Sequence, residues 1–159
     1  MIIAGTGHRP QFCPCGFDEN HPWIDSLKDR IRKNLIDKSA HVVISGCAIG
    51  LDTWLAECAL ELKIHLRMYV PFKGQGSNWP EKARKKYQYL LDNAALVYQV
   101  SENYSKDVFF KRDRAMIDDC NEVFALLDPN KKSGGTYYTV QYAQSLNKPI
   151  TNLWKNHEI

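Results

Sequence analysis

Residues 41–62, HVVISGCAIGLDTWLAECALEL, decide the fold class of this chain. The apolar run from His41 to Ser45 has the length and the β-branched content of a buried strand. A turn with two glycines follows, and from Leu51 to Lys63 apolar side chains recur at spacings of three and four, as on one face of an amphipathic helix. A strand that passes through a glycine turn into a helix is half of a β-α-β unit, from which parallel sheets are built.

The same alternation extends along the whole chain. Because alternating strands and helices with short connections imply parallel strands and right-handed crossovers, we expect one Rossmann-like three-layer α/β domain over residues 1–159, with a mostly parallel sheet. Strands are predicted at Met1–Gly5, His41–Ser45, Leu66–Pro71, Leu96–Val100, Glu122–Leu127 and Ile150–Leu153, and helices from Pro22, at Leu51–Lys63, from Pro80 to Asn93, at Asp107–Asp119 and at Thr136–Leu146.

Composition limits the classes of protein to consider. With 159 residues, of which 44% are hydrophobic and 25% charged, the chain is long enough for one domain with a real core. No apolar stretch approaches the roughly 20 residues that cross a bilayer, so we expect a cytoplasmic protein without membrane contact. The five cysteines are an odd number, which favours reduced thiols. A net charge of +3 is too small to demand a nucleic-acid partner, although residues 82–86 form a local basic cluster.

Three glycine-bearing turns, each after a predicted strand, are the candidate binding elements. They are residues 5–10 (GTGHRP), 45–52 (SGCAIGLD) and 133–136 (SGGT). Such turns leave unpaired backbone N–H groups and the positive end of a helix dipole directed at one point, where a phosphate can sit. At the carboxyl edge of a parallel sheet all three would line one cleft. The candidate ligand-binding residues are Gly5, Thr6, Gly7, His8, Arg9, Ser45, Gly46, Gly50, Asp52, Arg112, Ser133, Gly134, Gly135 and Thr136.

Several of these residues have an alternative structural role. Arg9 either grips a phosphate or pairs with an acid such as Asp18, and Asp52 either caps a helix or contacts a ribose or base. Arg112 either points into the cleft or belongs to surface ion pairs. Trp54 can stack on a base, but a large aromatic side chain at helical spacing is more often part of the core.

The turns also exclude two common nucleotide-binding classes. Pro10 stands where the third glycine of the dinucleotide fingerprint would be, which disfavours a conventional nicotinamide dehydrogenase. Residues 133–136 lack the lysine of a P-loop, which disfavours hydrolysis of a nucleoside triphosphate.

A metal site is also not indicated by the sequence. Cys13 and Cys15, with His8 and His21, do not have the spacing of a common zinc site. We expect neither a metal nor a cofactor.

Taken in order, the motifs at residues 5–11, 45–52, 71–80, 112–116 and 134–136 resemble the YpsA-like branch of the SLOG superfamily, nearly from end to end. This superfamily also includes Lonely Guy phosphoribohydrolases and the Rossmann domain of DNA-processing protein A. The resemblance implies a nucleotide-derived ligand in the cleft and suggests dimers or other homo-oligomers. It also implies kinship with domains that bind nucleotide signals in bacterial immunity.

Lonely Guy enzymes pair an arginine on the penultimate helix with a glutamate after a glycine-rich turn. Arg112 aligns with that arginine, but the glutamate position falls near Thr139, which cannot ionise. We therefore expect sensing or sequestration of a nucleotide or ADP-ribose-like signal, for instance as a phage-encoded sponge of an immune signal, rather than turnover. The alternatives are an N-glycosidic hydrolase, with Asp52, Glu57 or Asp128 as its carboxylate, and a single-stranded DNA-binding accessory protein that uses the basic residues 82–86.

Overall fold

Residues 1–154 are described by a computed structural model, which within this range contains a six-stranded sheet with every neighbouring pair of strands parallel. The strand order is β4-β3-β2-β1-β5-β6, so the chain first builds outward from β1 on one side and then returns to add β5 and β6 on the other. The strands are β1 (Ile2–Gly7), β2 (Val42–Ser45), β3 (His65–Phe72), β4 (Leu96–Ser101), β5 (Glu122–Leu126) and β6 (Ile150–Asn152).

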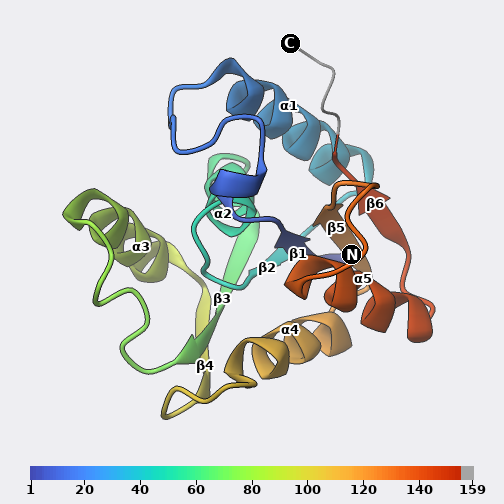
Figure 1. The fold of residues 1–159 in the computed structure, drawn as a ribbon. Coiled ribbons are helices and arrows are strands. Elements are labelled where there is room, and N and C mark those ends of the chain that lie inside the picture. The colour runs from blue at the N-terminus through green and yellow to red at the C-terminus, as the bar shows by residue number, and fades with distance from the viewer. Residues whose placement is uncertain (155–159) are drawn as a thin grey trace.

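Five α-helices cover the two faces of the sheet in this part of the chain (Figure 1). In that view α1 (Pro22–Asp37), α2 (Leu51–Glu61) and α3 (Glu81–Asn93) lie on one side of the strands. On the other side lie α4 (Val108–Asp119) and α5 (Gly135–Ser145). A short 3₁₀ helix, Pro10–Phe12, follows β1. This is the predicted three-layer α/β architecture, and the sheet is entirely parallel rather than mostly so.

Each face of the sheet carries its own hydrophobic core. Ile3, Val43 and Phe124 pack against α1 and α2, whereas their neighbours Ala4, Ile44 and Val123 pack beneath α4 and α5. This alternation is the period-two pattern of a strand that is buried on both faces. Both faces of β1, β2 and β5 are therefore covered by helices, whereas the edge where these strands end stays open to a ligand.

The sequence-based boundaries differ from the structure mainly at β1. This strand continues two residues beyond the predicted Gly5, because Gly5, Thr6 and Gly7 pair with Phe124, Ala125 and Leu126 of β5. The two glycines of the first motif thus lie at the end of a central strand rather than in a turn. The predicted helix from Pro22 is confirmed as α1, with its apolar positions buried and the Nδ1 atom of His21 accepting the backbone N–H of Trp23 at its start.

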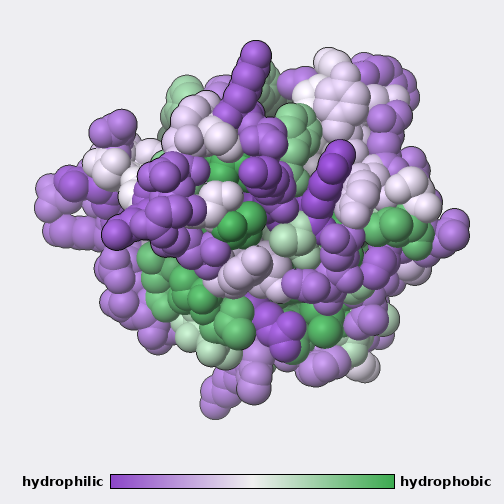
Figure 2. Space-filling view, turned by 90° about the horizontal axis from the view of Figure 1, so that it is seen from below, coloured by the Kyte–Doolittle hydropathy of each residue, from purple (hydrophilic) through white to green (hydrophobic). Residues whose placement is uncertain are grey.

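The outer strand β4 contrasts with the covered centre. Leu96 and Val97 are 46% and 50% exposed, and no strand of the described chain pairs with the outer edge of β4. Figure 2 views the molecule from the α4 side and shows hydrophobic patches between hydrophilic side chains on that face.

No helix in residues 1–154 is long and apolar enough to span a membrane.

Candidate ligand-binding cleft

A cleft of ≈ 460 Å³ lies at the carboxyl ends of β1 and β5. It lies where the chain leaves these adjacent strands in opposite directions across the sheet, which is the usual binding position in open α/β folds. Ten of the fourteen predicted site residues line it, together with six others. The lining residues are Gly5, Thr6, Gly7, His8, Arg9, Phe12, Ala48, Asp52, Phe109, Phe110, Arg112, Asp113, Lys131, Gly134, Gly135 and Thr136.

The start of α5 forms one wall of the cleft. No side chain caps this helix, so within the described chain the amide groups of its first turn are left without a side-chain acceptor. Gly134 has a φ of 97°, and a Cβ at Gly135 would meet no atom within 4 Å, so the backbone is open to a ligand here. The ammonium group of Lys131 lies beside this turn, 3.9 Å from the centre of the Phe12 ring. Amide groups, helix dipole and lysine together favour an anion.

Arg112 forms the opposite wall from α4. Its guanidinium is almost buried: Nη1 donates to the carbonyl oxygen of Gly46 at 2.5 Å, and Nε donates to Oδ1 of Asp113 at 2.8 Å. Burial opposes its charge, but Asp113 and Asp52 raise the pKa of Arg112 overall. Among the residues the structure describes, nothing accepts a hydrogen bond from Nη2, and this permanent cation borders the cleft.

Gly46 is required by Arg112 rather than by a ligand. A Cβ at this position would lie 2.9 Å from Cδ and 3.1 Å from Cζ of Arg112, so a larger residue would push the guanidinium out of its seat. The glycines of β1 also serve packing. A Cβ at Gly7 would meet Cβ of Leu51 at 2.8 Å, so this glycine allows α2 to approach the strand closely.

Asp113 is a carboxylate in the cleft that the sequence analysis did not single out. Its Oδ1 holds Arg112, and its Oδ2 lies 3.0 Å from the hydroxyl of Thr139. That hydroxyl is also 2.9 Å from the carbonyl oxygen of Gly135, at the start of α5. Thr139 on α5 has no carboxylate of its own, but the carboxylate of Asp113 on α4 lies beside it. The signal in the sequence was Asp113 directly after Arg112, which suggested a surface ion pair.

Asp52 closes the turn that precedes α2. Its Oδ2 accepts the N–H of Ala48 at 3.0 Å, and the hydroxyl of Ser45 donates to its carbonyl oxygen at 2.9 Å. Asp52 does not cap α2 as one of its predicted roles required, because Gly50 is the N-cap and no side chain caps the helix. The side chain of Asp52 is 8% exposed and lines the cleft, so contact with a ligand stays a prediction. Burial raises the pKa of Asp52 to about 6, although Arg112 and the N–H of Ala48 act in the opposite direction.

This raised pKa predicts a stability that falls as pH rises from about 4 to 6, since the folded state binds the proton of Asp52 more tightly than the unfolded chain does. At about 1.4 kcal/mol per pH unit, the effect is at most about 3 kcal/mol. Asp52→Asn keeps an oxygen for Ala48 and removes the charge. Between pH 4.5 and pH 7.5 the wild type should lose stability and the variant should not. The difference in the free energy of unfolding in urea, variant minus wild type, should therefore increase over this range.

Asp52→Ala is the control for this prediction. It leaves the buried N–H of Ala48 without its acceptor and should be destabilised at both pH values by about 1–3 kcal/mol. Parallel pH profiles for Asp52→Asn and the wild type would show that Asp52 ionises normally.

His8 and Arg9 differ in how the fold uses them. The Nε2 of His8 accepts the N–H of Asp128 at 3.0 Å, and its ring packs edge-on against Trp154. Burial and the charge of Lys131 lower the pKa of His8, which keeps Nε2 available as an acceptor. The side chain of Arg9, by contrast, makes no ion pair with Asp18 in the described chain, and it borders the cleft.

The remaining predicted residues lie around the cleft rather than in its lining. Ser45 is buried beneath the turn, Gly50 is the N-cap of α2 with a φ of 112°, and Ser133 is exposed beside the third glycine turn. Of the carboxylates proposed for an enzyme, Glu57 faces Lys28 and Lys86 outside the cleft. Asp128 is held in its own turn, where its Oδ1 accepts the N–H of Asn130.

A second compartment of ≈ 430 Å³ adjoins the cleft. Arg9, Ala48, Phe109 and Arg112 line both spaces, and the far wall is the turn of residues 72–79. Phe17, Phe72 and Trp79 contribute aromatic surface to it. Gln75 donates from Nε2 to the carbonyl oxygen of Cys47 at 3.1 Å. Within residues 1–154, no group of three or more His, Cys, Asp or Glu side chains is placed to hold a metal ion.

The fold and the position of the cleft define a Rossmann-like α/β protein with its candidate site at the point where the strand order reverses. The YpsA family model, described as the YspA SLOG family, matches residues 3–154. The chain therefore belongs to this family.

Two similar proteins from Bacillus species are named as UPF0398 proteins. The chain is 29% identical over 154 residues to a UPF0398 protein of Bacillus cereus (strain ATCC 14579), covering 90% of this chain and 82% of the relative. It is 28% identical over 154 residues, with the same coverage, to a UPF0398 protein of Bacillus thuringiensis (strain Al Hakam).

Two solved structures of DNA processing protein A share the fold. The Helicobacter pylori protein, solved in a study of its single-stranded DNA binding mode, superposes with a TM-score of 0.66 at 22% identity. That match covers 94% of this chain and 63% of that chain. The Streptococcus pneumoniae protein gives a TM-score of 0.65 at 18% identity, covering 93% of this chain and 48% of that chain. This chain thus spans less than two thirds of either protein.

Proposed function

We propose that the protein binds a nucleotide or ADP-ribose-like molecule in the cleft and senses or sequesters it. One observation carries the proposal: the uncapped start of α5 faces the same ≈ 460 Å³ cleft as the buried Arg112. Arg9 and Lys131 add positive charge at the same cleft. Phosphate oxygens would accept hydrogen bonds from the first amides of α5 and from these side chains.

The adjoining compartment has room for a second part of the same ligand. Because Arg9 and Arg112 border both spaces, a molecule that crosses between them places its charged link on two arginines. Its base would then lie among Phe17, Phe72 and Trp79, where aromatic stacking is tolerant of base identity. This arrangement favours a ligand with two organic halves joined by a diphosphate over a mononucleotide.

The test is a panel of nucleotides filtered away from the protein before and after heat denaturation and measured by mass spectrometry. The panel contains ADP-ribose, NAD, cyclic ADP-ribose isomers, cyclic dinucleotides and nucleoside monophosphates. We expect one diphosphate-linked compound to be depleted by the native protein and released intact on denaturation. Release as a free base and a sugar phosphate would overturn sequestration, and depletion of none would overturn the proposal.

N-glycosidic hydrolysis is the second candidate, favoured by the position of Asp113 beside Arg112 in the cleft. A carboxylate there is available to stabilise an oxocarbenium-like transition state or to act as a base. The same panel separates the candidates with Asp113→Asn: a hydrolase loses its product and keeps its ligand, whereas for a sequestering protein no product forms with either chain.

Single-stranded DNA is the third candidate, because the structural neighbour from Helicobacter pylori is described by its single-stranded DNA binding mode. The basic cluster on α3 supports it weakly, since Lys82, Lys85 and Lys86 are each ion-paired with a glutamate. Exposed aromatic side chains beside the cleft, Phe12 and Phe110, support it better. Binding of this kind falls steeply with salt, unlike that of a small ligand held by buried groups.

We further propose that the protein acts in the cytoplasm of a bacterium or during phage infection, as a homo-oligomer that regulates or removes an immune signal. The family resemblance supports this role. The open outer edge of β4, with Leu96 and Val97 exposed, offers a surface for a second copy.

A further inference from the structure

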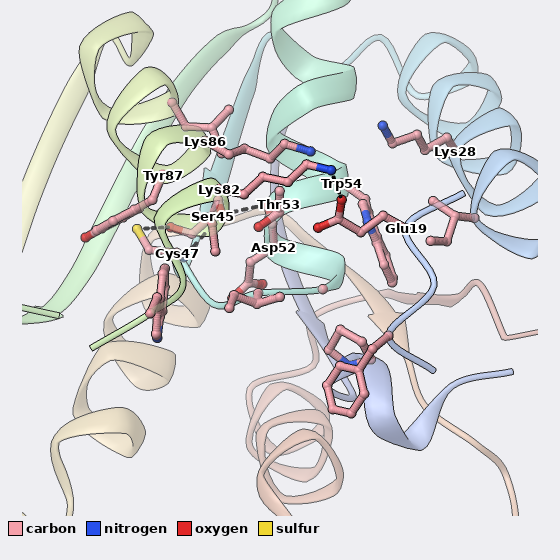
Figure 3. Close-up of a pocket in the computed structure, with 18 of the residues that line it drawn as sticks. Glu19, Lys28, Ser45, Cys47, Asp52, Thr53, Trp54, Lys82, Lys86 and Tyr87 are labelled. Carbon is pink, nitrogen blue, oxygen red and sulfur yellow. Dashed lines mark hydrogen bonds and ion pairs between the residues drawn. The ribbon is translucent and has the colours of Figure 1, made fainter. Parts of the chain in front are cut away.

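A cavity of ≈ 150 Å³ lies between α1, α2 and α3 (Figure 3). It borders the cleft at Asp52 and the adjoining compartment at Phe17 and Trp79, and it extends from there under α3. Its inner wall is apolar and buried, formed by Ile24, Trp54, Met68 and Leu90. Leu90 is the one residue of α3 that is buried, so this helix contributes a single fully buried side chain to the cavity wall. Space of this size suits a single ring and is too small for a whole nucleotide.

Charged side chains gather at the mouth. In Figure 3, Lys82 and Lys86 extend from α3 toward α1, and Lys28 extends back from α1. The Nζ atoms of Lys28 and Lys86 lie 3.4 Å and 3.6 Å from the two carboxylate oxygens of Glu57, which therefore stands between them.

These ion pairs are incomplete. The side chain of Lys28 is only 18% exposed, yet within the described chain its ammonium group donates no hydrogen bond. Oε1 of Glu57 is likewise buried without a hydrogen-bond partner. The contact between Lys28 and Glu57 is therefore an ion pair without a hydrogen bond, and the ammonium group keeps its donors for an acceptor that a ligand can supply.

The opening is held by a weaker contact. Lys82 pairs with Glu19 of the loop before α1 at 2.7 Å, and both side chains are more than half exposed. Exposed ion pairs of this kind contribute little to stability, so the loop and α3 can separate at small cost to admit a ligand. Asp18 also lines the mouth, but its Oδ1 already accepts the N–H of Asn20.

We propose that this cavity is a second binding site, for a small aromatic acid. The ring occupies the space beside Trp54, Met68 and Tyr87, and the carboxylate accepts hydrogen bonds from Lys28 and Lys86. The two ammonium groups then alternate with two carboxylates, that of Glu57 and that of the ligand. The groups that recognise the acid, Lys28 and Lys86, lie outside the lining of the cleft and of the adjoining compartment.

Benzoate and benzamide are matched probes, because they share the ring and the shape and differ in charge. Titration by calorimetry and by ligand-observed NMR should show benzoate binding at least about tenfold more tightly than benzamide, as charge-assisted hydrogen bonds are about twice as strong as neutral ones. Equal affinities, or no binding of benzoate at about 10 mM, would overturn the proposal.

Variants on α3 locate the site. Lys86→Gln should reduce benzoate affinity severalfold, whereas Lys85→Gln should not change it, because Lys85 lies outside the cavity lining and pairs with Glu81. Ala83→Trp fills the cavity and should abolish binding of both probes while leaving pyrophosphate binding in the cleft intact. If Ala83→Trp fails to fold, the two exposed lysine variants decide alone: equal benzoate affinities for them would refute the site.

Discussion

Arg112→Met is expected to lower the affinity for the cleft ligand by at least about 100-fold and the free energy of unfolding by about 3–5 kcal/mol. The first effect follows because the guanidinium is the cation shared by both compartments. The second follows because Asp113 loses its charged partner at 2.8 Å and the carbonyl of Gly46 loses its donor. Urea unfolding measures stability, and titration with pyrophosphate and ADP-ribose measures binding.

Two further chains separate these effects. Adding Asp113→Asn to Arg112→Met removes the unpaired carboxylate, so stability should recover in part while binding does not. Arg114→Met is the matched control, since Arg114 lies over the ring of Tyr142 and outside the cleft lining. Unchanged pyrophosphate affinity in a folded Arg112→Met protein would exclude Arg112 from the binding site.

Gly7→Ala is expected to destabilise the protein by about 3 kcal/mol, among the largest effects of adding one methyl group. The new Cβ would lie 2.8 Å from Cβ of Leu51 and 2.9 Å from Cβ of Leu126. Both neighbours are fixed to the backbone, so α2 or β5 must shift. Thermal unfolding of the purified protein measures the effect.

Gly135→Ala is the control for Gly7→Ala, because a Cβ at Gly135 has open space around it and alanine favours the helix. Its melting temperature should stay the same or rise slightly. Equal melting temperatures for Gly7→Ala and the wild type would mean that α2 can move away from β1 at little cost. The close packing of α2 on β1 would then not contribute to stability.

The fold was predictable from the sequence because its signals are local. Strand patterns such as Val42–Ser45 and the helical spacing of Ile24, Leu27 and Ile31 are confirmed by the structure. The position of the cleft was also predictable, since strand-ending turns of a parallel sheet share one edge. The assignment of these residues to ligand contacts stays a prediction.

The reasons for the glycines and the partners of the charges were not predictable. Gly5 and Gly7 indicated a turn open to a ligand, but the atoms that crowd them, from Leu51, Leu55 and Leu126, come from distant parts of the chain. The place of Asp113 depends on how α4 is rotated against α5, since its Oδ2 accepts a hydrogen bond from Thr139 of that helix. The cavity under α3 depends on the distance between two helices, which periodicity does not encode.

The central position of β1 determines when the cleft forms. β1 to β4 add to the sheet in sequence, each beside the strand before it, whereas β5 must return to pair Ile3 with Glu122. Closing so long a loop costs more entropy than the neighbouring pairings do. The sheet half from β1 to β4 can therefore assemble during synthesis with β1 as its open edge, and the cleft appears only when β5 and α5 have left the ribosome.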